Sequence, residues 1–110
     1  MLLSRARLAA ESVIRDYGPE ILDEVYEVIL QRKATMPEGS YVASLLNGGW
    51  RQIGKKVVEE AGETIIAAAE NDPQRLAEEA ADLIFHTLVL LADADTDPAL
   101  VWKELADRRQ

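Results

Sequence analysis

The strongest constraint on the fold is a pair of long amphipathic segments that a single Asp72-Pro73 step separates. Trp50 to Asn71 and Pro73 to Ala92 each carry apolar side chains at the three- and four-residue spacing of a helix. Asp72 is a preferred N-cap residue, and proline is favoured at the first helical position. So short a break makes two helices run side by side in opposite directions. The sequence therefore predicts an αα-hairpin.

The remainder of the chain is also expected to be helix and loop. Gly18-Pro19, Pro37 to Gly39, and Asn47-Gly48-Gly49 are breaks, and Ser40 can cap the segment that follows it. No segment shows the polar–apolar alternation of a strand. The expected fold class is all-α, a helical hairpin subunit with two long central antiparallel helices. Further helices are predicted over residues 2–17, 20–33, 41–46 and 98–108, with Asp97 as the cap of the last one.

Length and charge limit the possible functions. A chain of 110 residues has room for one domain, expected over residues 20–110, with residues 1–19 as an N-terminal extension that is helical or flexible. The net charge of −8 argues against nucleic acid as a partner, because duplex affinity depends on Lys and Arg. No apolar run is long enough for a membrane span, and a cytoplasmic location is expected. With no cysteine and one histidine, thiolate chemistry and cysteine-based zinc sites are excluded.

Five carboxylates lie symmetrically about the predicted turn. Glu59, Glu60 and Glu63 fall within an arc of about 100° on the first long helix, and Glu79 and Asp82 lie one turn apart on the second. Like charges at such spacings weaken a helix unless cations lie between them. Mg²⁺ takes carboxylates, waters and substrate phosphates as ligands. The pattern therefore favours a Mg²⁺ site between the helices, whereas isolated acidic pairs are more often solvated surface.

Other polar residues leave alternatives open. His86, one turn after Asp82, is either a packed histidine with one hydrogen bond or a residue that orients a ligating carboxylate. Lys56 projects beside the Glu59–Glu60 arc and could touch a phosphate, and Arg32 and Lys33 precede a loop of the kind that contacts ligands. Each cation taken alone could also be a solvated surface charge.

Four strings carry a resemblance to known proteins. The chain contains, in order, QRK at 31–33, PEGSYV at 37–42, KKVVEEAGE at 55–63 and EEAADLIFH at 78–86. The acid motif resembles that of the MazG-like all-α nucleotide pyrophosphatases. The PEGSY loop and the EEAADLIFH helix are similar to the phosphoribosyl-ATP pyrophosphatase branch. The resemblance extends from about Ile21 to Arg108, and residues 1–19 precede the usual start of that family.

The resemblance implies an activity and a set of site residues. The implied reaction is Mg²⁺-dependent hydrolysis of phosphoribosyl-ATP to phosphoribosyl-AMP and pyrophosphate in histidine biosynthesis. It also implies a homodimer, or a dimer of dimers, whose helices form multi-helix bundles around the sites. The implied metal ligands are Glu60, Glu63, Glu79 and Asp82. The implied catalytic acids are Glu59, Glu60 and Glu63, with Glu59 a ligand or a base. The expected substrate-binding residues are Arg32, Lys33, Ser40, Tyr41 and Lys56.

Two alternatives remain at this point. The first is a MazG-like house-cleaning pyrophosphatase that acts on NTPs or dNTPs, against which the PEGSY loop argues because it lies outside the shared acid motif. The second is a non-enzymatic helical dimerisation module with incidental surface acids. A small-molecule nucleotide substrate is expected for either enzyme.

Overall fold

The computed structural model describes residues 17–109, so nearly all of the predicted 2–17 helix lies outside the described residues. Within that range the chain is helical and contains no strand. The helices are α2 (Ile21–Thr35), α3 (Tyr41–Ala69), α4 (Pro73–Asp93) and α5 (Ala99–Asp107). The all-α prediction is confirmed for the described part of the chain, and the proposed domain boundary near residue 19 stays a prediction.

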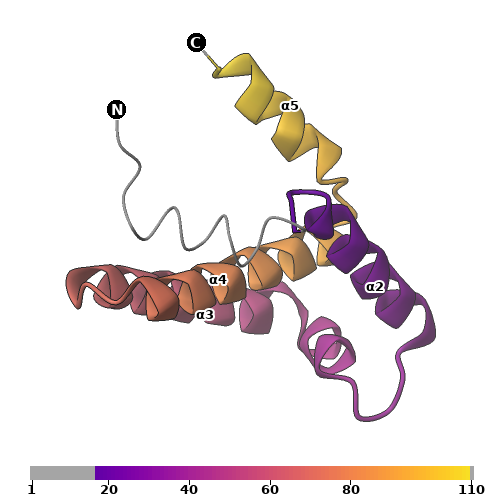
Figure 1. The fold of residues 1–110 in the computed structure, drawn as a ribbon. Coiled ribbons are helices and arrows are strands. Elements are labelled where there is room, and N and C mark those ends of the chain that lie inside the picture. Colours follow the sequence, from indigo (N-terminus) through magenta and orange to yellow (C-terminus); the bar gives the residue numbers. More distant parts are fainter. Residues whose placement is uncertain (1–16, 110) are drawn as a thin grey trace.

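The central feature is the antiparallel pair formed by α3 and α4 (Figure 1). The carboxylate of Asp72 accepts a hydrogen bond from the Arg75 backbone N–H at 3.1 Å, and Pro73 is the first residue of α4. This is the predicted cap. α3 ends at Ala69, slightly before the predicted end, because Asn71 turns the chain in the left-handed region at φ 56°. Asparagine tolerates that conformation better than most residues.

A break at Gly49 divides α3 into a short segment and a long helix that point in different directions (Figure 1). Gly49 has φ 78° and ψ −174°, a combination open almost only to glycine. Ser40 begins the short segment, and its Oγ accepts a hydrogen bond from the Ala43 backbone N–H at 3.1 Å. The predicted cap at Ser40 and the predicted interruption at residues 47–49 are both confirmed.

The core lies where α2, the two parts of α3 and α4 meet. Four large apolar side chains are at most 2% exposed, and they come one from each of these segments: Ile29, Leu45, Ile53 and Val89. Burying a side chain of this size contributes about 1.5–3 kcal/mol. The core therefore fixes the short segment of α3 and helix α2 against the hairpin.

Polar contacts fasten α2 to the C-terminal end of α4. The Lys33 ammonium donates to the Ala92 carbonyl at 2.7 Å and pairs with Asp95 at 2.5 Å. The Tyr26 hydroxyl donates to the Thr96 carbonyl at 3.2 Å. A cation at this position satisfies a terminal carbonyl and complements the negative end of the helix dipole.

Helix α5 extends away from the hairpin (Figure 1). The Asp97 carboxylate accepts a hydrogen bond from the Ala99 N–H at 2.9 Å, although the N-cap of α5 is Pro98, one residue later than predicted. Of the helices in residues 17–109, none combines the length and the apolar character that crossing a bilayer requires.

The backbone at Gly49 generates a test of the fold. Gly49→Ala should lower the free energy of unfolding by roughly 1–3 kcal/mol, because alanine must adopt a strained conformation there. No atom lies within 4 Å of a Cβ built at Gly49, so the cost comes from the backbone rather than from a clash. Urea denaturation at matched protein concentration measures it.

Gly54→Ala is the matched control, since Gly54 lies in the same helix, has helical backbone angles and also has open space at its Cβ. It should raise the free energy of unfolding by about 0.5–1 kcal/mol. Equal effects of the two substitutions would show that the break at Gly49 is not required.

Candidate metal centre

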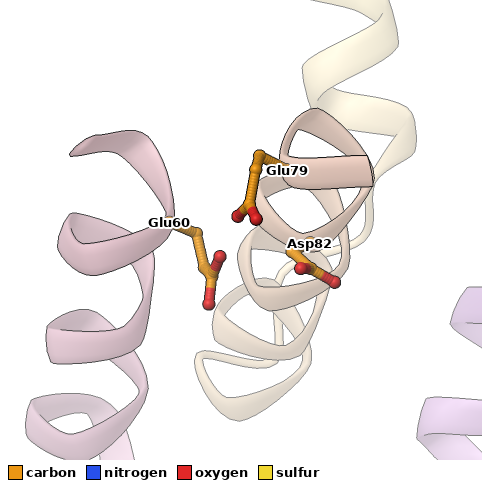
Figure 2. Close-up of side chains that lie close together, drawn as sticks. All are labelled: Glu60, Glu79 and Asp82. Atoms are coloured by element: carbon orange, nitrogen blue, oxygen red, sulfur yellow. The ribbon is translucent and has the colours of Figure 1, made fainter. Parts of the chain in front are cut away.

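Three carboxylates from the two hairpin helices converge on one point. Glu60 of α3 and Glu79 of α4 point toward each other, and Asp82 lies beside Glu79 on the next turn of α4 (Figure 2). One oxygen atom from each residue lies within 4.8 Å of the others. The antiparallel register set by the Asp72-Pro73 turn produces this facing arrangement.

The carboxylates of this cluster repel one another, and one of them is partly buried. The pKa of Glu79 is raised, first by burial, then by a hydrogen bond with Glu60 and by the negative charges of Glu60, Asp82 and Glu63. Glu79 is partly buried, as its position beside an apolar arc of α4 predicts. Both burial and the neighbouring negative charges therefore disfavour the ionised form of Glu79.

The donor set suits a hard divalent cation. All three converging groups offer carboxylate oxygen, with no sulfur or imidazole in the cluster. Mg²⁺ prefers oxygen ligands, and it commonly uses a few carboxylates while water and phosphate complete its coordination. Glu60, Glu79 and Asp82 can therefore hold Mg²⁺, and the positive charge would relieve their mutual repulsion.

Glu63, one turn beyond Glu60, is engaged elsewhere. Its carboxylate is 3.2 Å from one guanidinium nitrogen of Arg75, and the other nitrogen contacts Glu70 at 2.6 Å. Arg75 lies in the first turns of α4 and spans the end of the hairpin. The structure thus places Glu63 beside the cluster, with an arginine as its partner.

Arg75 was not singled out from the sequence. A signal was nevertheless present, since a basic residue three positions after the Asp72 cap faces back across the turn toward the end of the preceding helix. Both carboxylates it contacts raise its pKa, with the hydrogen bond to Glu70 as the largest cause.

Lys56 joins the cluster from one turn earlier on α3. Its ammonium is 3.3 Å from the Glu59 carboxylate and 3.6 Å from that of Glu60. The hydrogen bond to Glu59 and the proximity of Tyr41 raise the pKa of Lys56. The structure therefore brings Lys56, Glu59 and Glu60 together, as the helical spacing predicts.

Tyr41 and His86 meet although 45 residues separate them in the sequence. The Tyr41 hydroxyl is 2.7 Å from His86 Nε2, and His86 Nδ1 is 2.7 Å from the Asp82 backbone oxygen. Of the two sequence-based alternatives for His86, neither describes it fully. It is buried and packed, but it has two hydrogen bonds, and it contacts the backbone of Asp82 rather than its carboxylate.

The other expected substrate-binding residues show no contact with the carboxylate cluster among the contacts that the structure gives for residues 17–109. Lys33 contacts the end of α4 at Ala92, about 15 Å along the helix from Asp82. Arg32 occupies the same last turn of α2 as Lys33. The Ser40 Oγ accepts the capping hydrogen bond of α3. Their roles toward substrate stay predictions.

Comparison with known proteins matches most of the chain to one family. The sequence profile of the family described as phosphoribosyl-ATP pyrophosphohydrolase matches residues 22–109. A phosphoribosyl-ATP pyrophosphatase of Geobacter sulfurreducens is 53% identical over 89 residues, which are 81% of this chain and 82% of the relative. One from Azospirillum brasilense is 47% identical over 88 residues, covering 80% of this chain and 79% of the relative.

A longer relative shows the same region joined to other sequence. The histidine biosynthesis bifunctional protein HisIE of Deinococcus radiodurans is 51% identical over 87 residues, which are 79% of this chain and 40% of that protein. The matched residues include the whole hairpin and every carboxylate of the cluster. On these grounds the chain belongs to the phosphoribosyl-ATP pyrophosphohydrolase family.

Proposed function

We propose that this chain hydrolyses phosphoribosyl-ATP to phosphoribosyl-AMP and pyrophosphate in histidine biosynthesis, and that the reaction requires Mg²⁺. The observation that carries the proposal is the convergence of Glu60, Glu79 and Asp82 from facing helices. The names of the relatives support the substrate, and the all-oxygen donor set supports the ion. Because this substrate is a water-soluble phosphorylated nucleotide, we also propose a cytoplasmic location.

The residues divide into ligands and supporting groups. Glu60, Glu79 and Asp82 would hold Mg²⁺, with Glu63 as a proposed fourth ligand from the next turn of α3. A bound Mg²⁺ supplies positive charge that stabilises the negative charge developing on the phosphate chain during cleavage. Arg75 pairs with Glu63 at the edge of the cluster and partly offsets its negative charge.

The chain's own side chains supply binding and proton transfer. Lys56, which carries a positive charge beside Glu60, can contact a phosphate oxygen and shield it from the acidic surroundings. Glu59 lies just outside the converging carboxylates and is 48% exposed, which supports a role in accepting a proton from the attacking water. Phosphoryl transfer depends mainly on such positioning and electrostatics.

The assembly is proposed to be a homodimer or a dimer of dimers. In a single copy, α3 exposes Val58 at 73% and Ile65 at 70%, two residues on one face two turns apart. Ile84 of α4 is 47% exposed. Covering an apolar face of this kind against a second hairpin would produce the multi-helix bundle that the sequence resemblance implies.

Substrate and metal can be tested together. Pyrophosphate release from phosphoribosyl-ATP should be faster than from ATP or any dNTP at equal concentration, and it should stop in EDTA. Adding excess Mg²⁺ should restore it. Faster release from a dNTP would favour the house-cleaning activity, and full turnover in EDTA would rule out the metal-dependent reaction.

Amide substitutions separate metal ligands from surface acids. Glu79→Gln and Asp82→Asn should each lower kcat/KM by at least about 10²-fold, a loss of roughly 2.7 kcal/mol in transition-state stabilisation. Without Mg²⁺ these variants should be as stable as the wild type or slightly more stable, because a repelling charge is removed. Steady-state kinetics and thermal melts in EDTA provide the two measurements.

Glu78→Gln is the matched control, since Glu78 neighbours Glu79 on α4, is exposed and lies outside the cluster. It should change neither quantity appreciably. If all three variants retained wild-type turnover, the carboxylate cluster would not be the site.

The proposed homodimer or dimer of dimers can be tested by the mass of the protein in solution. Light scattering at micromolar concentration should give at least twice the 12.2 kDa of one chain. Val58→Glu should shift that mass toward the single chain, because it places a charge in the apolar contact. A wild-type mass near that of one chain would contradict the proposed dimer.

A further inference from the structure

His86 is buried at the contact between α4 and the start of α3, and both its ring nitrogens have partners. The side chain is 5% exposed. Nδ1 lies 2.7 Å from the Asp82 backbone oxygen, and Nε2 lies 2.7 Å from the Tyr41 hydroxyl oxygen. The Tyr41 ring also stacks near Phe85, with ring centroids 6.4 Å apart.

For a neutral imidazole, these partners set the direction of both hydrogen bonds. A backbone carbonyl can only accept, so His86 Nδ1 must carry the proton and donate to Asp82. In a neutral imidazole the other nitrogen is then an acceptor. The Tyr41 hydroxyl therefore donates its only proton to Nε2.

This direction defines what the Tyr41 oxygen can still bind. With its proton committed to His86, the oxygen has lone pairs only, and it can bind nothing but a hydrogen-bond donor. The Tyr41 side chain is 51% exposed, and the residue is close enough to Lys56 to affect its pKa. Lys56 in turn contacts Glu60 of the cluster at 3.6 Å. The acceptor thus lies at the border of the candidate metal centre.

We propose that His86 is a positioning residue that fixes the Tyr41 hydroxyl as a hydrogen-bond acceptor, and that this oxygen selects a donor group of the bound nucleotide. This inference rests on the proposed function. A ribose hydroxyl or an exocyclic amine can donate to Tyr41, whereas a fully ionised phosphate cannot. Tyr41 therefore contributes to recognition of the nucleoside part, and contacts to the phosphates fall to the cations and the metal.

The tautomer of His86 can be read directly, because the sequence contains one histidine. In untagged ¹⁵N-labelled protein near neutral pH, a long-range ¹H–¹⁵N spectrum should show the proton on Nδ1. Tyr41→Phe should shift the Nε2 resonance, because that nitrogen loses its donor. A proton on Nε2, or no shift in the Tyr41→Phe variant, would overturn the proposed direction of the hydrogen bond.

Steady-state kinetics test whether the direction of the Tyr41–His86 hydrogen bond affects the binding of phosphoribosyl-ATP. Tyr41→Phe should raise KM for phosphoribosyl-ATP by about 3- to 10-fold, as expected for a lost neutral hydrogen bond, with kcat within about twofold. His86→Asn can still donate to the Asp82 carbonyl but no longer reaches Tyr41, and it should raise KM similarly. His86→Gln extends an amide oxygen toward the Tyr41 hydroxyl and should retain most of the wild-type KM.

A double-mutant cycle separates positioning from a structural role. In the Tyr41→Phe background, His86→Asn should raise KM less than about twofold further, because the shared hydroxyl is already gone. An undiminished effect of His86→Asn in that background would assign His86 a role independent of Tyr41. A loss confined to kcat would place its effect on the carboxylate cluster. Either result overturns the inference.

Failure of the proposed function is distinguishable from failure of this inference. Absence of phosphoribosyl-ATP hydrolysis by the wild type would overturn the proposed function, but the tautomer spectrum would still give its answer. The same variants would then be compared by the Kd for phosphoribosyl-ATP, measured by titration calorimetry. The expected order of weakening is unchanged, with wild type and His86→Gln binding more tightly than His86→Asn and Tyr41→Phe.

Discussion

The packing of α3 against α4 is the contact on which the candidate site depends. It sets apolar side chains on one side of the helix pair and brings acidic side chains together on another. The burial of apolar residues such as Ile53 and Val89 makes the packing of the two helices favourable in free energy. The unfavourable part is the approach of Glu60, Glu79 and Asp82. Burial, and after it the nearby carboxylates, raise the pKa of Glu79. The hairpin holds an electrostatic arrangement that isolated helices would avoid, and this is how a fold can prepare a cation site before the cation arrives.

Local sequence signals were sufficient for most of the helices. The caps at Ser40 and Asp72 and the break at Gly49 act within a few residues, so their structural effects can be inferred from the residue types. The facing of Glu60 with Glu79 and Asp82 also follows from helical periodicity once the turn is known. Family resemblance added the substrate, which periodicity does not specify.

Some contacts were not predicted from the sequence. They depend on how α2 and the short segment of α3 pack on the hairpin. The Tyr41–His86 hydrogen bond requires the direction change at Gly49, whose angle no propensity specifies. Lys33 shows the same limit, since its position before a loop favoured a ligand contact, whereas packing of α2 takes its ammonium to the end of α4. Arg75 differs, because its partners lie just across the turn and a search for charge compensation could have identified it.

The contacts between α2 and the end of α4 also affect the order in which the helices fold and pack. The hydrogen bonds of Lys33 to Ala92 and of Tyr26 to Thr96 join residues 59 and 70 positions apart. Closing loops of that length costs entropy before any contact compensates for it, whereas the α3–α4 turn closes over a few residues. We therefore expect the hairpin to form first and α2 to dock last. The carboxylates would then be assembled early, in a folding nucleus that must tolerate their repulsion before the rest of the core is in place.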